Sequence, residues 1–220
     1  FCSSSEDEIA LHLYGGISTS VELKSGKVAL RETSNYPWSG DIRIEIDPDA
    51  ASQFTLNLRI PGWCKGASVT VNGETVTASA AKGYLPVKRV WTKGDVVSLS
   101  LPMQAERVYA NPSVSMDVAR VALSRGPLIY CVEEADNPGR PVQRLKLPRR
   151  SELKSETRGD LLGGAVTLGA DAVAIKDGDW KDTLYRSAAP NEEPARLTAV
   201  PYYLWNNRGQ GSMLVWVPEA

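Results

Sequence analysis

The chain has 220 residues and a mass of 23.9 kDa, enough for one large β domain or for two domains of about 100 residues each. Its 25 basic and 26 acidic residues give a net charge of −1, which argues against a nucleic-acid partner because such a surface needs a basic excess. No apolar run approaches the roughly 18 residues of a transmembrane helix, so the sequence predicts no membrane partner.

The N-terminal segment, residues 1–6, begins with Phe1 and not with an initiator methionine. It reads as the tail of a preceding part of a polypeptide. We therefore expect the chain to be the β-sandwich portion of a larger protein. A signal peptide is not seen, but its absence decides little about the compartment, because an N-terminus that lies upstream would carry it.

Apolar and polar residues alternate along residues 42–47, 54–60 and 96–101. A period of two predicts strands that have one face on a core and one face on water, which is typical of antiparallel sheets. Asn72-Gly73 predicts a tight hairpin turn, because both residues tolerate a positive φ. Turn residues recur at short intervals and no helical stripe extends over three turns, so the sequence predicts an all-β protein.

A boundary near Gln104 divides the predicted strands into two series. We therefore expect two consecutive antiparallel β-sandwich (jelly-roll-like) domains, at residues 7–104 and 105–220. In the second domain, the charged and Pro-rich stretch 138–164 predicts an excursion between strands or an extension that packs on a neighbour. Residues 197–205 and 212–217 predict the last two strands, joined by a hairpin turn rich in Gly and Asn.

Few residues in the sequence have a spacing that indicates chemistry. Cys2, Cys64 and Cys131 are odd in number and far apart, so they form neither a disulfide framework nor a zinc ribbon. His12 is the single histidine, which excludes a multi-His zinc site, and no nucleophile motif accompanies it. Residues 177–182 resemble a calcium loop only faintly, because the closing glutamate of an EF-hand is missing, and they read as a solvated acidic turn.

The six tryptophans and eight tyrosines leave two interpretations open. Flat aromatic rings form platforms for sugars, but a ring with a polar tip is also favoured in a core or at an interface between domains. The candidate interface or sugar-contact aromatics are Tyr36, Trp38, Trp63 and Trp205. We identify no catalytic residue and no metal-binding residue.

A series of short motifs spans almost the whole chain. The motifs are Asn-Tyr-Pro-Trp-Ser-Gly at 35–40, Leu-Arg-Ile-Pro-Gly-Trp-Cys at 58–64, Val-Asn-Gly at 71–73, Gly-Tyr-Leu at 83–85, Trp-Thr-Lys-Gly-Asp at 91–95, Leu-Pro-Met at 101–103, Arg-Gly-Pro-Leu-Ile-Tyr-Cys-Val-Glu at 125–133 and Leu-Thr-Ala-Val-Pro-Tyr-Tyr-Leu-Trp-Asn-Asn-Arg-Gly at 197–209. In this order they resemble the region after the catalytic barrel in family 127 glycoside hydrolases, the β-L-arabinofuranosidase family. Related families with the same architecture, such as family 146, are not separated by these motifs.

The resemblance implies an (α/α)6 barrel followed by two β-sandwiches in the parent enzyme. In the family, the barrel holds a zinc ion, its cysteine and glutamate ligands and a cysteine nucleophile. The family's Cys-Cys-Pro-Pro-Asn motif does not occur in this chain, and Cys64 and Cys131 match sandwich positions and not zinc ligands. Residues 1–6 resemble the end of the last barrel helix. No catalytic or metal-binding residue is therefore carried over.

These implications define the expected function. We expect the chain to be a non-catalytic portion of a bacterial enzyme that degrades plant glycans, inactive alone, with no cofactor of its own and with zinc in the parent's barrel. The expected partner is that barrel; carbohydrate and a homodimer of the parent are further candidates, and the expected compartment is the bacterial cytoplasm or periplasm. The alternative is a stand-alone carbohydrate-binding or adhesion-type sandwich.

Overall fold

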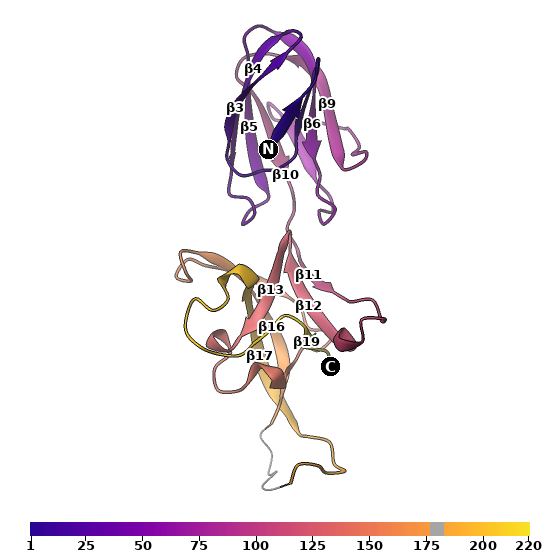
Figure 1. Ribbon diagram of the computed structural model, residues 1–220, viewed down its shortest axis with the longest axis vertical. Helices are drawn as coiled ribbons and strands as arrows, with labels where there is room; N and C mark the ends of the chain where they lie inside the picture. Colours follow the sequence, from indigo (N-terminus) through magenta and orange to yellow (C-terminus); the bar gives the residue numbers. More distant parts are fainter. Residues whose placement is uncertain (177–182) are drawn as a thin grey trace. The chain divides into compact units, whose positions relative to one another are not determined.

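The computed structural model describes residues 1–176 and 183–220 and shows a chain whose regular secondary structure is almost all β-strand (Figure 1). It divides into two compact units, Phe1–Met103 and Gln104–Ala220, here called unit 1 and unit 2. Gln104, the last residue of the first expected domain, is the first residue of unit 2. The acidic stretch 177–182 lies outside the described residues. In the described part of the chain, no helix has the length and apolar character that a membrane span requires.

Unit 1 contains two sheets. Their strands are β1 (Cys2–Ser4), β2 (Glu8–Leu11), β3 (Ser18–Leu23), β4 (Gly26–Ser34), β5 (Asp41–Pro48), β6 (Ser52–Arg59), β7 (Ser68–Val71), β8 (Glu74–Thr75), β9 (Tyr84–Trp91) and β10 (Asp95–Ser100). One sheet has the order β1-β2-β6-β9 and the other has the order β3-β4-β5-β10-β7-β8. Every described pair is antiparallel except β2 with β6, which are parallel.

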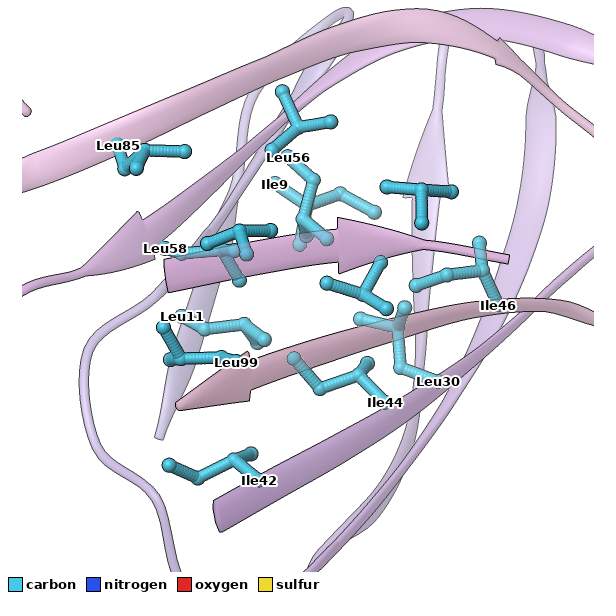
Figure 2. Packing of buried hydrophobic residues seen from close by; sticks show 14 of the residues in the cluster. Ile9, Leu11, Leu30, Ile42, Ile44, Ile46, Leu56, Leu58, Leu85 and Leu99 are labelled. Atoms are coloured by element: carbon cyan, nitrogen blue, oxygen red, sulfur yellow. The ribbon is translucent and has the colours of Figure 1, made fainter. Parts of the chain in front are cut away.

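The core of unit 1 lies between these two sheets. The alternating residues Ile42, Ile44 and Ile46 of β5 are buried, while Arg43 between them is exposed. Leu56 and Leu58 of β6 come from the opposite sheet and belong to the same buried cluster, and Figure 2 shows these side chains converging. Each such buried side chain contributes about 1.5–3 kcal/mol of hydrophobic free energy. The predicted strands and their inward faces are therefore confirmed for this unit.

Two local expectations for unit 1 have different outcomes. The predicted hairpin turn is confirmed, because Asn72 and Gly73 have φ values of 51° and 84° and connect β7 to β8. Residues 1–6 differ from the helix end that the resemblance implies: Cys2–Ser4 form a strand that pairs with β2, with Cys2 opposite Leu11. The pairing gives this segment backbone partners, which a short isolated helical turn would lack.

Unit 2 contains a larger sheet of nine strands and several short 3₁₀ turns. The elements are β11 (Ala105–Val108), η1 (Ser115–Asp117), β12 (Arg120–Arg125), β13 (Leu128–Glu133), η2 (Glu134–Asp136), η3 (Val142–Arg144), β14 (Leu145–Lys146), β15 (Lys154–Arg158), β16 (Ala165–Ile175), β17 (Glu192–Pro201), η4 (Tyr202–Leu204), β18 (Met213–Leu214) and β19 (Val217–Pro218). The main order is β11-β12-β13-β17-β16-β14, with β15 on β16, β18 on β13 and β19 on β12.

The stretch 138–164 belongs to the fold of unit 2. Val142, Leu145 and Leu147 are buried in its core, and β14 and β15 both pair with β16. The predicted hairpin between the last two strands is wrong, because β18 pairs with β13 and β19 pairs with β12. After β17, Arg208 contacts Glu133 at the end of β13 and Asp136 of η2.

Candidate functional site

Tyr36 and Trp63 lie together at the edge of the core of unit 1. The indole N–H of Trp63 donates to the Tyr36 hydroxyl. The ring of Tyr36 also meets the buried ring of Tyr14 edge-on, with centroids 6.2 Å apart. Both Tyr36 and Trp63 are partly buried against the hydrophobic cluster. The structure therefore brings two of the predicted aromatics together, in an arrangement that stabilises loops.

The titratable groups in this cluster are held in their neutral forms. Burial raises the pKa of Tyr14, whose hydroxyl donates to the backbone carbonyl of Arg59 at 2.8 Å. Burial likewise raises the pKa of Tyr36 and, next to it, the pKa of the Cys64 thiol. A thiol is a nucleophile only as thiolate, so Cys64 lacks the environment that activates a cysteine. These groups do not have the properties of an acid–base pair at neutral pH.

Trp38 differs from the partly buried Tyr36 and Trp63 because it is 49% exposed. It lies in the turn between β4 and β5, where its backbone N–H donates to the Asn35 carbonyl at 2.8 Å. The Tyr36-Pro37 bond in the same turn is cis. Trp38 is thus the exposed aromatic of this turn.

His12 bridges two hydroxyl groups. Its Nε2 lies 2.8 Å from Ser3 Oγ, and its Nδ1 lies 2.6 Å from the hydroxyl of Tyr84. The second nitrogen therefore binds a phenol and not the carboxylate that orients histidine in a Ser-His-Asp triad. The imidazole, directly after β2, contacts one residue of β1 and one of β9, the two outer strands of the sheet β1-β2-β6-β9. Sequence reasoning missed this contact because the β1–β2 pairing creates it.

In the described part of the chain, no group of three or more His, Cys, Asp and Glu side chains could hold a metal ion. The two cysteines outside β1 also do not have the character of ligands. Cys131 is buried in unit 2, where burial raises the pKa of its thiol to about 12, and Cys64 has the raised pKa described above. The described residues thus do not fit a zinc site.

Trp205 belongs to unit 2 and forms an exposed aromatic pair. Its ring stacks on that of Tyr202, with centroids 6.0 Å apart and planes 23° from parallel. Trp205 is 40% exposed and Tyr202 is 45% exposed. The 3₁₀ turn η4 positions both rings directly after β17. This pair keeps an apolar face open to a partner or to a sugar ring.

A cluster of carboxylates holds the loop that follows Trp205. The guanidinium of Arg208 binds Glu133 and both oxygens of Asp136, the latter at 2.5 Å. Hydrogen bonds to Asp136, and after it Glu133, raise the pKa of Arg208. Glu134 accepts hydrogen bonds from the Ser212 N–H and hydroxyl at 2.9 and 2.8 Å, which lower the pKa of that carboxyl group.

The role of this cluster is structural. Glu133 is buried, and its second oxygen accepts from the Asn206 N–H at 3.2 Å. The carboxylates of β13 and η2 thereby fix both ends of the loop, near Asn206 and near Ser212. Sequence reasoning missed these contacts; the run of three acidic residues within 133–136 and one arginine in a Gly- and Asn-rich loop was the available signal.

Two family models match the chain, each over one of its units. Residues 8–103 match the model described as "Beta-L-arabinofuranosidase, GH127 middle domain". Residues 105–218 match the "Glycoside hydrolase family 127 C-terminal domain". The two matches meet at the boundary between the units.

Individual relatives agree with the family models. A non-reducing end β-L-arabinofuranosidase from Bifidobacterium longum subsp. longum is 36% identical over 211 residues, covering 91% of this chain and 32% of that protein. A GH127 β-L-arabinofuranosidase from Geobacillus stearothermophilus T6 superimposes with a TM-score of 0.93 at 42% identity, covering 100% of this chain and 35% of that one. A GH127 β-arabinofuranosidase gives a TM-score of 0.88 at 33% identity, covering 100% and 36%. The chain thus spans about a third of the length of these relatives.

Proposed function

The chain belongs to glycoside hydrolase family 127, and we propose that it serves as the non-catalytic β-sandwich portion of a β-L-arabinofuranosidase-like enzyme of plant-glycan degradation. Its partner would be a catalytic (α/α)6 barrel in the same polypeptide. One observation carries this proposal: the chain matches the middle and C-terminal domains of the family and covers only 32–36% of the relatives' length.

The chemistry of the described residues favours a non-catalytic, structural role. The hydroxyls of Tyr14 and Tyr36 are raised in pKa and hydrogen-bonded, and the thiols of Cys64 and Cys131 are held protonated. None of these groups is prepared as a nucleophile. The zinc ion that the resemblance implies would belong to the barrel, and no step of catalysis is assigned to this chain. A homodimer of the parent is a further part of the proposal.

The proposal is tested by assaying the 220-residue chain and the whole protein on an aryl β-L-arabinofuranoside. We expect turnover by the whole protein and none by the chain, because the chain holds no activated nucleophile or acid–base pair in its described part. Addition of zinc to the chain should change nothing. Zinc-dependent turnover by the chain alone would overturn the proposal.

A second candidate function is a carbohydrate-binding module, favoured by the exposed stack of Tyr202 and Trp205. Calorimetric titration of the chain with arabino-oligosaccharides discriminates the two readings. Binding that Trp205→Ala abolishes would favour the module. Unchanged heats across the titration would leave the stack as an interface element.

A further inference from the structure

We propose that unit 2 carries a binding site for one neutral sugar ring in the cavity beside Tyr109. The cavity has a volume of about 310 Å³, which is small for a ligand site and suits one ring better than an oligosaccharide. Its walls come from the loop between β11 and β12, from the segment before β15 and from the residue after β19. The residues that carry the argument are Tyr109, Pro112, Asp117, Arg120, Arg149 and Glu219.

The ring of Tyr109 is a fixed platform. Its hydroxyl donates to Glu219 Oε1 at 2.7 Å, and the Glu219 side chain is only 4% exposed. The same carboxylate accepts from Arg149 Nε at 2.9 Å and lies 3.6 Å from Arg107 Nη1. The hydrogen bond to Glu219 raises the pKa of Tyr109, so the hydroxyl stays a donor.

This anchoring leaves the ring face open. Tyr109 is 57% exposed, although its hydroxyl is held from behind by a buried, doubly paired carboxylate. A tyrosine that only filled a surface gap would not need a buried acid to orient it. Ring faces of this kind bind the apolar C–H face of a sugar, and Pro112 adds apolar surface beside it.

The polar groups of the cavity have hydrogen-bonding capacity that other residues do not use. The carboxylate of Asp117 is half-buried, and it has no hydrogen-bond or ion-pair partner in the described part of the chain. The Arg149 side chain is 74% exposed, and its contact with Glu219 uses Nε. Arg120 donates through Nη1 to the Trp216 carbonyl at 3.0 Å. The cavity therefore offers one free acceptor and several guanidinium N–H donors.

The charges at the cavity favour a neutral ligand. Two arginines, Arg120 and Arg149, face two carboxylates, Asp117 and Glu219, so the lining carries no net charge. A phosphate would meet the Asp117 carboxylate, and an amine would meet the two guanidinium groups. Vicinal hydroxyls satisfy both sides, since each donates to a carboxylate and accepts from a guanidinium. This inference does not depend on the activity of the whole protein.

The test is a titration of the ¹⁵N-labelled 220-residue chain with L-arabinose, followed by NMR. We expect saturable shifts of the Arg149 Nε–H and of the backbone amides around Asp117. D-glucose, inorganic phosphate and methylamine are titrated as comparison probes. We expect phosphate and methylamine to leave these signals unchanged.

Two substitutions in the cavity and one outside it locate the binding. Tyr109→Ala and Asp117→Asn should each weaken binding by about tenfold or more, the effect of losing one stacking face or one charged acceptor. Both residues lie in a loop, so the spectrum away from the cavity should stay unchanged and report an intact fold. Tyr202→Ala, which removes another exposed ring of the same unit, 45% exposed, should leave the titration as it is.

Three results would overturn the inference. They are the absence of saturable shifts with either sugar, shifts confined to the Tyr202–Trp205 pair, and binding of phosphate in place of sugar. Tyr109→Phe keeps the ring but releases it from Glu219. It should retain part of the affinity, and affinity equal to that of the unsubstituted chain would refute the role of the anchor.

Discussion

The aromatic residues of this chain divide by what surrounds them and not by their type. Tyr36 and Trp63 are hydrogen-bonded to each other at the edge of the core of unit 1. Trp38, two residues after Tyr36, is half exposed. Trp205 shares its exposure with Tyr202. The sequence motif 35–40 identifies the residues of interest, but only the fold separates the aromatic rings that pack against the core of unit 1 from those that are exposed.

The exposure of Trp38 leads to a prediction about an interface with the barrel. Trp38→Ala should lower the stability of the whole protein by about 2 kcal/mol, the hydrophobic free energy of one large buried side chain. In the isolated 220-residue chain the same change should cost much less, because the ring is already half exposed. Thermal unfolding of both proteins measures the difference.

Trp63→Ala is the matched control for this comparison. It removes the hydrogen bond to Tyr36 and packing against the core, so it should destabilise both proteins to a similar extent. Equal effects of Trp38→Ala in the two proteins would show that Trp38 contacts no partner.

At the scale of elements, ionic contacts decide where the segment after β17 goes. Its side chains alone predict a hairpin, yet β18 and β19 pair with β13 and β12. Arg208 binds Glu133 and Asp136, and Ser212 binds Glu134, so the loop follows the carboxylates of β13 and η2. Contacts between charged residues far apart in sequence thus outweigh the tendency of the Gly- and Asn-rich loop to form a local hairpin turn.

Removal of Arg208 should therefore be costly. Arg208→Met leaves the buried Glu133 carboxylate without its cation, and losing one partner of a buried pair costs about 3–5 kcal/mol. Arg196→Met breaks the exposed pair with Asp171, where the two side chains are 69% and 83% exposed, and should cost about 0–1 kcal/mol. Urea unfolding of unit 2 compares them. Similar losses would contradict the role of the cluster.

Gly40 determines how closely β5 starts beside the end of β10. A Cβ at this position would lie 1.9 Å from the carbonyl oxygen of Leu101, whose N–H donates to the Gly40 carbonyl at 2.8 Å. Gly40→Ala should therefore destabilise unit 1 by about 1–3 kcal/mol or more, the cost of overpacking. Gly62→Ala has nothing within 4 Å of the added atom and should change the free energy of unfolding by less than about 1 kcal/mol. Chemical denaturation of the two variants checks the contrast.

At the scale of the whole molecule, each unit has its own hydrophobic core. Alternation along residues 42–47 and 54–60 was sufficient to predict strands, inward faces and the all-β class, because a period of two is a local property. The strand at Cys2–Ser4, the bridge at His12 and the pairing of β19 with β12 could not be predicted in this way. They depend on contacts between residues far apart in sequence.

Both units should lose stability in alkali. Burial raises the pKa of Tyr130 in unit 2 to about 12 and also raises that of Tyr14 in unit 1, above the ordinary value of 10.0. Because the unfolded chain loses these protons first, the stability is present below pH 10 and decreases as the pH rises toward 12, by about 2 kcal/mol for Tyr130. Unfolding midpoints measured between pH 8 and pH 11.5 follow this loss.

Two tyrosine substitutions identify the group that causes the loss of stability in alkali. Tyr130→Phe should flatten the pH dependence of unit 2 above about pH 10, while Tyr185→Phe, at a residue 88% exposed, should not. A pH dependence that is unaltered in Tyr130→Phe would assign the alkaline loss to other groups.

The pairing of β19 with β12 has a consequence for biosynthesis. Val217 of β19 lies opposite Val121 of β12 and is fully buried. The strand β12, near the start of unit 2, can therefore pair with β19 only after almost a hundred further residues have been synthesised. Contacts this distant in sequence form slowly, because the entropic cost of closing the long loop comes before the contacts stabilise the fold. A ribosome must therefore release Val217 before unit 2 completes its fold, whereas unit 1 has its last strand, β10, by Ser100. Unit 1 can thus fold during synthesis before unit 2, and Val121 has no strand partner at Val217 until that residue has left the ribosome.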